Sequence, residues 1–329
     1  MRIGLLSSAH MHVQAYVQGL QLFPEVELVG LYDDNSERGR AFAEKAHLPW
    51  HAGLDSQLSQ VDATIICSEN AKHRFYVEQS AAAGLSVLCE KPLATTLDDA
   101  LFMLEAMKSA GVPLYLALPV RFTPGFSPLL DAVRQGHVGR VLAMVGTNHG
   151  YLPPGWFLDS AQAGGGAVMD HTPHVVDLMR LIAHSEVEEV FAEMDSRVHQ
   201  AGIDDCGILT LTFQNGAFAT LDPSWSRTSG FPTPVDVTLE VVGTKGVIDF
   251  DAFRSHLDLY QSRDPNHQHV GFGESMDARL IGAFISSLTD KSPHPLLARG
   301  IDGLRALEVA LAAYRSHKSQ QSVPIEHLL

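Results

Sequence analysis

Three shortages in the sequence each exclude a class of protein. The 329 residues include only three cysteines, widely spaced and without a CxxC pair, which argues against a disulfide framework or a cysteine zinc site. Apolar runs stay well short of the roughly 20 residues needed to span a bilayer. A formal net charge of -15 opposes binding to nucleic acid or to an anionic membrane. We therefore expect a small, largely neutral ligand, with no nucleic-acid partner and no membrane partner.

The chain is too long for a single hydrophobic core, so two domains are expected. Residues 1–118 alternate short apolar strands with amphipathic helices, which predicts an α/β domain with a doubly wound, Rossmann-type parallel sheet. Residues 2–6 already form a predicted strand rather than a signal peptide, so we expect a cytoplasmic protein. The strands of this domain are predicted at 2–6, 26–32, 63–67, 86–89 and 114–117.

Residues 119–329 have a different pattern, in which alternating strands dominate and helices are few. This predicts an α+β domain built on a large, mainly antiparallel open sheet, with Asn215-Gly216 as a hairpin turn. Residues 260–274, rich in Gly, His, Asn and Asp, predict a surface loop. The strands are predicted at 140–149, 187–197, 206–213, 218–226, 235–242 and 247–250, with late helices at 276–288 and 302–316.

Glycine is missing where a dinucleotide-binding fold normally needs it. The first strand-to-helix turn should have the spacing Gly-x-Gly-x-x-Gly, so that backbone amides can approach a pyrophosphate. Small or hydroxylated residues at the first two positions still permit a tight turn, while a histidine at the third would crowd the helix against the strand. The candidate pyrophosphate-binding residues of this turn are Ser7, Ser8, Ala9, His10, Met11 and His12.

Two further segments are expected to line a cofactor site. Asp33 follows the second strand, where an acidic residue would accept hydrogen bonds from the adenosine ribose and repel a 2'-phosphate, which favours NAD over NADP. Asp33 could instead cap the helix that begins near Asn35. A polar loop follows the third strand, and its candidate cofactor-binding residues are Ser68, Glu69, Asn70 and His73.

Glu90 and Lys91 follow the apolar strand that ends at Cys89, and Pro92 forces the chain out of the sheet. Ligands of open α/β sheets bind in the crevice outside the carboxyl ends of the strands. Glu90 and Lys91 are therefore candidate cofactor-contacting residues, and Lys91 is also a candidate catalytic residue, although a solvated loop lysine is the plain alternative.

A second cluster follows three glycines at 164–166. Asp170, His174 and Asp177 have the spacing i, i+4 and i+7, so on a continuous helix they share one face. A carboxylate and an imidazole on one face suit acid/base catalysis. Two alternatives remain: Asp170 could cap the helix, or Asp170 could bind a metal with His171, His174, His10 and His12. No HExxH or comparable motif supports a metal, and none is expected.

These features together resemble the Gfo/Idh/MocA family of oxidoreductases, named after glucose-fructose oxidoreductase and inositol dehydrogenase. The resemblance rests on Glu90-Lys91-Pro92 and on the GGGxxxDxxxHxxD pattern of residues 164–177, and it covers nearly the whole chain. It implies hydride transfer between NAD and a sugar, inositol or other polyol. It also implies a homo-oligomer, a dimer or a tetramer, paired through the open sheet.

The resemblance also assigns roles to residues. Lys91 matches the lysine that binds the reacting hydroxyl, His174 the histidine that acts as acid or base, and Asp170 the aspartate that supports it. Further candidate substrate contacts are Arg121, Trp156, Phe157 and His171. Two other functions stay open: a sugar-sensing or scaffolding family member without turnover, suggested by the missing glycines, and an NAD-dependent lyase or glycoside hydrolase on the same fold.

Overall fold

The computed structural model describes residues 1–231, 233, 235–261, 264–271 and 273–329, with the side chains of 256–271 left out. The chain forms two compact units. Unit 1 comprises residues 1–119, 161–164 and 276–307, and unit 2 comprises residues 120–160, 165–275 and 308–329. The domain boundary expected after residue 118 stays a prediction, while residues 276–307 belong to the same compact unit as the first 119 residues.

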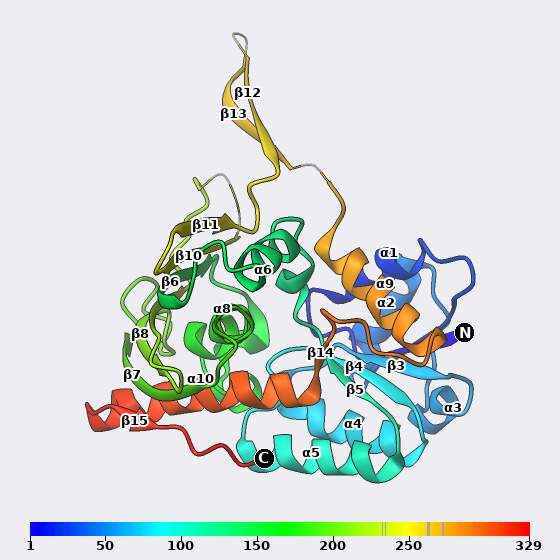
Figure 1. The fold of residues 1–329 in the computed structure, drawn as a ribbon. Helices are drawn as coiled ribbons and strands as arrows, with labels where there is room; N and C mark the ends of the chain where they lie inside the picture. The colour runs from blue at the N-terminus through cyan, green and yellow to red at the C-terminus, as the bar shows by residue number, and fades with distance from the viewer. Residues whose placement is uncertain (232, 234, 262–263, 272) are drawn as a thin grey trace. The chain divides into compact units, whose positions relative to one another are not determined.

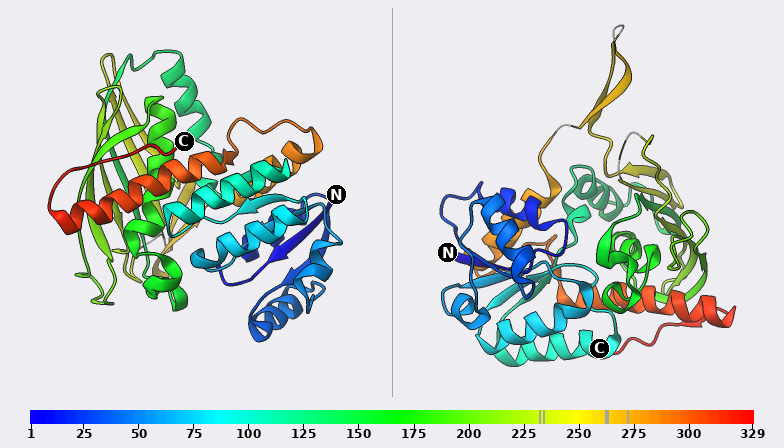
Figure 2. Two further views of the ribbon diagram at one scale, coloured as in Figure 1. Left: turned by 90° about the horizontal axis from the view of Figure 1, so that it is seen from below. Right: turned by 180° about the vertical axis from the view of Figure 1, so that it is seen from behind.

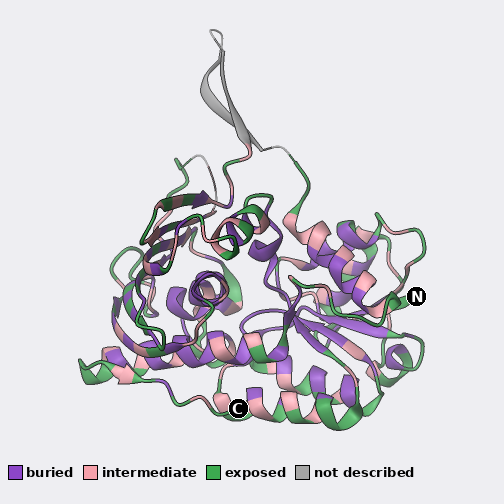
Figure 3. Cartoon of the chain, in the orientation of Figure 1, coloured by how far each residue is buried: buried purple, intermediate pink, exposed green. Residues whose placement is uncertain are grey.

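Unit 1 is built on the six-stranded sheet A, in the order β14-β5-β4-β3-β1-β2 (Figure 1). Strands β1 to β5 are parallel, and β14 is antiparallel to β5. The inner strands are mostly apolar and mostly buried, as parallel strands are when helices cover both faces (Figure 3). The strands are β1 (Arg2–Leu6), β2 (Glu27–Tyr32), β3 (Ala63–Ile66), β4 (Ser86–Cys89), β5 (Leu114–Leu116) and β14 (Ala298–Arg299).

Helices connect the parallel strands, and local signals set their ends. In α5, the Thr96 side chain accepts a hydrogen bond from the Asp99 amide at the start, and Gly111 ends the helix in the left-handed conformation. Gly19 lets α1 approach α9, because a Cβ there would lie 3.3 Å from the Ala278 Cα. The helices are α1 (Val13–Leu20), α2 (Ser36–Ala46), α3 (Leu54–Leu58), η1 (Asn70–Lys72), α4 (His73–Ala82), α5 (Leu97–Ala110) and α9 (Met276–Thr289).

Unit 2 is built on the seven-stranded sheet B, in the order β11-β10-β6-β9-β8-β7-β15. Its neighbouring strands are antiparallel except for β6 and β9, so the expected mainly antiparallel sheet is confirmed. The strands are β6 (Val141–Gly150), β7 (Val187–Asp195), β8 (Cys206–Phe213), β9 (Phe218–Ser224), β10 (Val235–Gly243), β11 (Val247–Asp251) and β15 (Val323–Pro324).

One face of sheet B is covered by α8 (Ala167–Ala183), which contacts β6, β8 and β9 (Figure 2). Side chains of the strands alternate between buried and exposed, as expected for a sheet with one face on the core. The remaining helical segments that include unit 2 residues are η2 (Pro119–Phe122), α6 (Phe126–Arg134), η3 (Gly155–Leu158), α7 (Ser160–Ala163) and α10 (Gly300–Ser319).

The predicted elements agree with the structure to within about two residues at most ends, with two kinds of difference. Several short elements were not predicted, among them α3, α7, β14 and β15. The loop predicted over 260–274 is wrong where the structure describes it, because β12 (His256–Gln261) and β13 (Asp264–Gly271) pair as an antiparallel ladder; residues 262–263 and 272 lie outside the described part. Among the described residues, none of the helices has both the length and the apolarity to cross a membrane.

The glycines before α8 are required by the protein's own packing. A Cβ on Gly166 would lie 2.0 Å from the backbone oxygen of Asp204, and one on Gly165 would lie 2.1 Å from the Tyr314 hydroxyl. The Asp204 carboxylate accepts hydrogen bonds of 2.9 Å from the amides of Gly166 and Val168, so Asp204 supplies the cap of α8. The alternative that Asp170 caps this helix is therefore wrong.

We expect Gly166→Ala to lower the free energy of unfolding by about 1–3 kcal/mol, because the added methyl group meets backbone that cannot easily move. The matched control is Gly230→Ala, since a Cβ at Gly230 has no described atom within 4 Å; it should change stability by less than about 0.5 kcal/mol. Urea unfolding followed by circular dichroism measures both. A Gly166→Ala protein as stable as the wild type would contradict the packing argument.

Candidate active site

The strand order of sheet A places a ligand crevice at the carboxyl ends of β1 and β3, where the order of strands reverses. The turn after β1, the loop after β3 and the residues after β4 all lie at this edge. Their side chains are polar, in contrast to the apolar strands that precede them. The predicted cofactor residues of unit 1 are therefore brought to one edge of the sheet.

The turn after β1 is tight without glycine. Ser7 adopts φ +68°, the left-handed conformation that a glycine would favour. Five of the six backbone amides in residues 7–12 donate hydrogen bonds within unit 1: to Tyr32 O, Asp33 Oδ2, Ser7 Oγ, Cys67 O and His10 Nδ1. The turn is thus held by internal bonds that a glycine-rich loop would leave for a phosphate.

Asp33 is buried and already engaged by Arg38 of α2. Arg38 donates from Nε to Asp33 Oδ2 at 2.9 Å and from a terminal nitrogen to Oδ1 at 2.7 Å. Burial would raise the pKa of the Asp33 carboxyl, but the hydrogen bonds from Arg38 and Ser8 outweigh it and hold this pKa below its usual value. The helix cap is Asn35, whose side chain accepts from the Arg38 amide, so the capping alternative for Asp33 is wrong.

Residues of the loop after β3 form hydrogen bonds with several other segments of unit 1. Glu69 accepts a 2.8 Å hydrogen bond from Arg38, which lowers the pKa of its carboxyl although burial acts in the opposite direction. The Asn70 side chain donates to Ala163 O at 2.9 Å, and His73 Nδ1 donates to Pro92 O at 2.9 Å. The Ser68 hydroxyl is buried and bonds to Glu69 O. A cofactor role for these four residues stays a prediction.

Glu90 is fully buried at the end of β4 and is the centre of a polar cluster. Its Oε1 accepts a hydrogen bond from the Tyr16 hydroxyl and lies 3.0 Å from His12 Nδ1. Burial would raise the pKa of Glu90, but the charges of His10 and His12 hold it well below its usual range. Burial would lower the pKa of His12, and the charge of Glu90 outweighs this and raises it.

Lys91 lies directly after this cluster and is 4% exposed. Its amide donates to Glu90 Oε2 at 3.1 Å, so the carboxylate that binds His12 and Tyr16 also fixes the backbone of the lysine. The alternative of a solvated loop lysine is wrong. Lys91 is instead a buried cation at the edge of the sheet where ligands bind.

The second cluster lies at the start of α8 in unit 2. Asp170 Oδ2 accepts a 3.0 Å hydrogen bond from the Trp225 indole and lies 3.3 Å from His171 Nε2. His171 Nδ1 donates to Asn148 O at 2.8 Å, which fixes its ring. His174 follows on the same helix and is 9% exposed. The carboxylate is therefore oriented by an indole and an imidazole, as a substrate-binding group should be.

The remaining predicted residues of unit 2 have contacts within the protein. Arg121 is buried and pairs with Asp177 through two nitrogens, Nε contacting Oδ2 at 2.5 Å. Trp156 and Phe157 stack with ring centroids 4.0 Å apart, and Phe157 is buried. A substrate role for these three residues stays a prediction.

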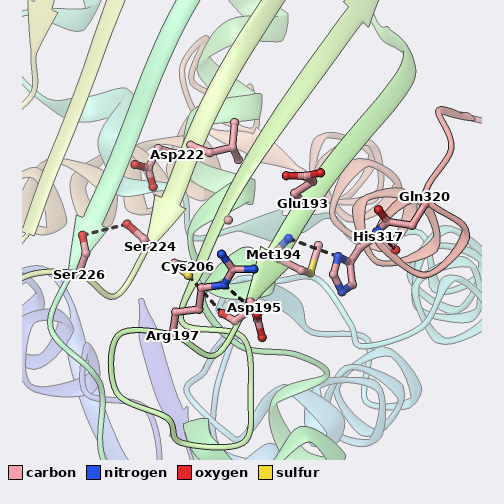
Figure 4. A pocket seen from close by; sticks show the side chains of 12 residues that line it. Glu193, Met194, Asp195, Arg197, Cys206, Asp222, Ser224, Ser226, His317 and Gln320 are labelled. Atoms are coloured by element: carbon pink, nitrogen blue, oxygen red, sulfur yellow. Dashed lines mark hydrogen bonds and ion pairs between the residues drawn. The ribbon is translucent and has the colours of Figure 1, made fainter.

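A separate cavity of about 470 Å³ lies on the exposed face of sheet B (Figure 4). It is polar, with carboxylates from Glu193, Asp195 and Asp222 and the imidazole of His317. Arg197 within it donates to Asp195 at 2.8 Å. No residue predicted from the sequence as part of the active site lines this cavity.

Sequence reasoning missed Arg38, Tyr16, Asp204 and Trp225 as partners of the predicted site residues. Tyr16 lies four residues after His12 on α1, so its position on the same helix face was a usable signal. Arg38 lies only five residues after Asp33, in the first turn of α2. Asp204 and Trp225 reach Gly166 and Asp170 from 38 and 55 residues away, and local spacing gives no hint of them.

The turn after β1 and the start of α1 lie where a Rossmann-type fold binds a dinucleotide. The turn with left-handed Ser7 leads into α1 at the switch point, and a helix N-terminus there favours a pyrophosphate. His12 is the N-cap residue that precedes α1. Its side chain contacts Glu90 and does not cap the amides of the helix. A ribose bound by Asp33 would have to replace hydrogen bonds that Arg38 now makes.

Comparison with known proteins agrees with this geometry. Residues 3–118 match the model described as "Oxidoreductase family, NAD-binding Rossmann fold", and residues 127–249 match the "GFO/IDH/MocA C-terminal domain". The chain belongs to the Gfo/Idh/MocA family of oxidoreductases. The family confirms the resemblance, the fold class and the prediction of a dehydrogenase-type enzyme with an NAD-binding Rossmann domain.

Relatives of this Gfo/Idh/MocA protein include inositol and sugar enzymes. The myo-inositol 2-dehydrogenase of Thermotoga maritima is 30% identical over 344 residues, covering 100% of each chain. The 1,5-anhydro-D-fructose reductase of Ensifer adhaerens is 32% identical over 227 residues, 67% of each chain. The structure of GenD2 from gentamicin A biosynthesis, solved with NAD, has a TM-score of 0.90 at 22% identity, covering 99% of this chain and 97% of that chain, which shows the shared fold.

In this Gfo/Idh/MocA protein, we expect Arg38→Gln to lower the free energy of unfolding at pH 7 by about 2 kcal/mol, since it leaves buried Asp33 without its cation and Glu69 with Lys72 alone. Both carboxyls have lowered pKa values in the folded state, so the stability they contribute is present above their unfolded values near 4 and is lost as the pH falls further. The difference between variant and wild type should therefore shrink below about pH 4.

Urea unfolding at several pH values measures this difference. The matched control is Arg197→Gln, which removes an exposed Arg–Asp pair of similar length and should leave the pH dependence unchanged. A constant difference from pH 7 to pH 3 would show that Arg38 acts through packing rather than through the two carboxylates.

Proposed function

We propose that this protein is an NAD-dependent dehydrogenase that oxidises a hydroxyl-bearing carbon of a sugar, inositol or related polyol. The observation that carries the proposal is a buried lysine at the ligand edge of an NAD-binding Rossmann fold. Relatives that share 30–32% of their sequence are named for myo-inositol and 1,5-anhydro-D-fructose, which supports the substrate class.

In this proposal Lys91 and His174 handle the proton of the reacting hydroxyl. When bound, the nicotinamide supplies the hydride acceptor. Lys91 holds the hydroxyl through its ammonium and stabilises the negative charge that develops on the oxygen. His174 takes up the proton, and Asp170, oriented by Trp225, binds a neighbouring substrate hydroxyl.

NAD is proposed over NADP because Asp33 is held ionised at the end of β2, where a carboxylate repels a 2'-phosphate. Arg38 is the opposing feature, since a guanidinium next to that position is the group that accepts such a phosphate. Its nitrogens are committed to Asp33, Ser7 and Glu69, so its charge is largely neutralised where it stands.

Titration with NADH and NADPH by fluorescence tests this proposal directly. We expect NADH to bind at least about tenfold more tightly than NADPH, because the Asp33 carboxylate disfavours the extra phosphate. Arg38→Gln should weaken any NADPH binding and shift the ratio further toward NADH. If neither NADH nor NADPH bound at millimolar concentration, the dehydrogenase function would be contradicted.

Substitution of the proton-handling residues tests the mechanism. With a polyol that the wild type oxidises, Lys91→Met and His174→Asn should each lower kcat by about 10²–10³-fold, since each removes a group that acts mainly in the transition state. Lys108→Met is the matched control, because Lys108 is an exposed lysine of α5. NADH affinity of the His174 variant should stay near the wild-type value, which separates chemistry from cofactor binding.

We also propose that the protein forms a homo-oligomer through the uncovered face of sheet B. Four large apolar side chains are 49–56% exposed there, one each from β6, β8, β9 and β11: Val145, Ile208, Phe218 and Val247. Exposed apolar groups gathered on one sheet face are typical of an interface between subunits.

Light scattering after size-exclusion chromatography tests the oligomer. The wild type should elute as a dimer or tetramer, and the double variant Val145→Glu with Phe218→Glu should elute as a smaller species, because it places charges in an apolar interface. A wild type that is monomeric at high micromolar concentration would contradict the proposal. The control is Leu22→Glu, an exposed apolar residue outside sheet B.

A sugar-binding family member without turnover is the second candidate. It is favoured by one observation, the internal hydrogen bonds that engage most amides of the turn after β1. The nucleotide titration distinguishes the two, since this candidate requires polyol binding with no NADH or NADPH binding.

A further inference from the structure

Three metal-ligating groups converge within unit 1, apart from the residues that we propose for proton transfer. Nδ1 of His12 lies 3.0 Å, and Nδ1 of His10 3.5 Å, from Oε1 of Glu90. One ligand atom from each of the three residues lies within 4.8 Å of the other two. Glu90 and His10 are buried and His12 is partly exposed, so the cluster has an opening at His12.

The contacts of His10 bring an imidazole nitrogen close to a carboxylate oxygen. His10 Nδ1 lies 3.3 Å from the His12 amide, a long hydrogen bond, and 3.5 Å from Glu90 Oε1. A metal ion bound to this Nδ1 would take the lone pair that now accepts the His12 amide. The Glu90 carboxylate is buried and therefore favours a positive charge beside it.

A further carboxylate lies close to the cluster. Asp277, at the start of α9, interacts electrostatically with both His12 and Glu90. Its Oδ1 is buried and has no hydrogen-bond partner among the described residues. This carboxyl is a nearby oxygen donor, and a divalent cation in the cluster would stabilise its ionised form.

The distances match a small transition-metal ion. Zn²⁺ binds histidine nitrogen and carboxylate oxygen at about 2.0–2.2 Å in tetrahedral geometry, which separates ligand atoms by about 3.3–3.5 Å. The two separations from Glu90 Oε1, 3.0 and 3.5 Å, bracket this value. Two histidines and one carboxylate leave a fourth position open, as in other sites of this ligand type.

We propose that His10, His12 and Glu90 form a binding site for one divalent transition-metal ion, with Zn²⁺ as the best chemical match. Sequence spacing does not connect Glu90 with the two histidines, because Glu90 lies 78 residues beyond His12. The metal alternative considered from the sequence combined His10 and His12 with Asp170, His171 and His174 instead. The proposal is independent of the dehydrogenase function, since it requires only the folded chain without nucleotide or polyol.

Calorimetric titration tests the site on tag-free, full-length protein that has been stripped with a chelator and dialysed. We expect the wild type to bind one Zn²⁺ per chain with micromolar or tighter affinity, and to show a higher unfolding temperature with the ion than without it. His10→Ala and His12→Ala should each weaken binding by at least about tenfold, because each removes one of three ligands.

Two control variants test whether the loss of Zn²⁺ binding is specific to the three proposed ligands. Met11→Ala alters the same turn between the two histidines but keeps all three ligands, so it should bind Zn²⁺ like the wild type. His137→Ala removes an exposed histidine of unit 2 and should also have no effect. Circular dichroism confirms that each variant is folded.

Cobalt provides a second readout that does not depend on variant stability. Co²⁺ added to the stripped wild type should give the intense visible absorption of a tetrahedral site, and Zn²⁺ should displace it. The proposal is overturned if the wild type binds neither ion at tens of micromolar. It is equally overturned if the two histidine variants bind Zn²⁺ as tightly as the wild type.

Discussion

The buried carboxylate of Glu90 is the constraint on which the ligand edge of unit 1 depends. A carboxylate removed from water is costly unless charged partners and hydrogen bonds compensate it. Tyr16 and His12 provide them from α1, and His10 adds a third contact. Because all three come from the turn and helix after β1, the charge at the end of β4 fixes the start of α1. Glu90 Oε2 in turn accepts the Lys91 amide, so the backbone of the buried lysine is tied to the same carboxylate.

This arrangement explains why histidine is acceptable where the glycine fingerprint has glycine. The third glycine of that pattern allows close packing of helix and strand. Here the imidazole of His12 occupies that place and contacts the carboxylate of the neighbouring strand end. Packing by a small residue is replaced by a charged contact, and Ser7 keeps the turn tight through its left-handed backbone. The turn after β1 therefore stays tight, and α1 stays close to the sheet, without the glycines of the fingerprint.

The repeated alternation of strands and helices made the fold of unit 1 predictable, since a buried parallel sheet leaves few other ways to arrange such segments. The same holds for the alternating strands of sheet B. The β12–β13 ladder escaped prediction because β13 is mostly polar, so hydrogen bonding rather than apolar alternation defines it. In the site, residues within one turn or helix were found, such as Glu90 with Lys91 or Asp170 with His174. Asp204, which lies 38 residues beyond Gly166, reaches it only through the folded topology and has no signature in the sequence. Arg38 lies only five residues after Asp33, but its side chain also joins Ser7 and Glu69, which local spacing does not show.

The partners that were not predicted from the sequence also change the free energy of ligand binding. A carboxylate left open to solvent offers its hydrogen bonds to a ligand with little competition. The carboxylate of Asp33 instead accepts from Arg38 and Ser8, so a ligand that uses it must first displace bonds of similar strength. Net affinity then comes from the difference between the two sets of bonds rather than from the new set alone. Arg38 also holds Glu69 together with Lys72, so its release would remove one of the two cations that pair with the loop after β3.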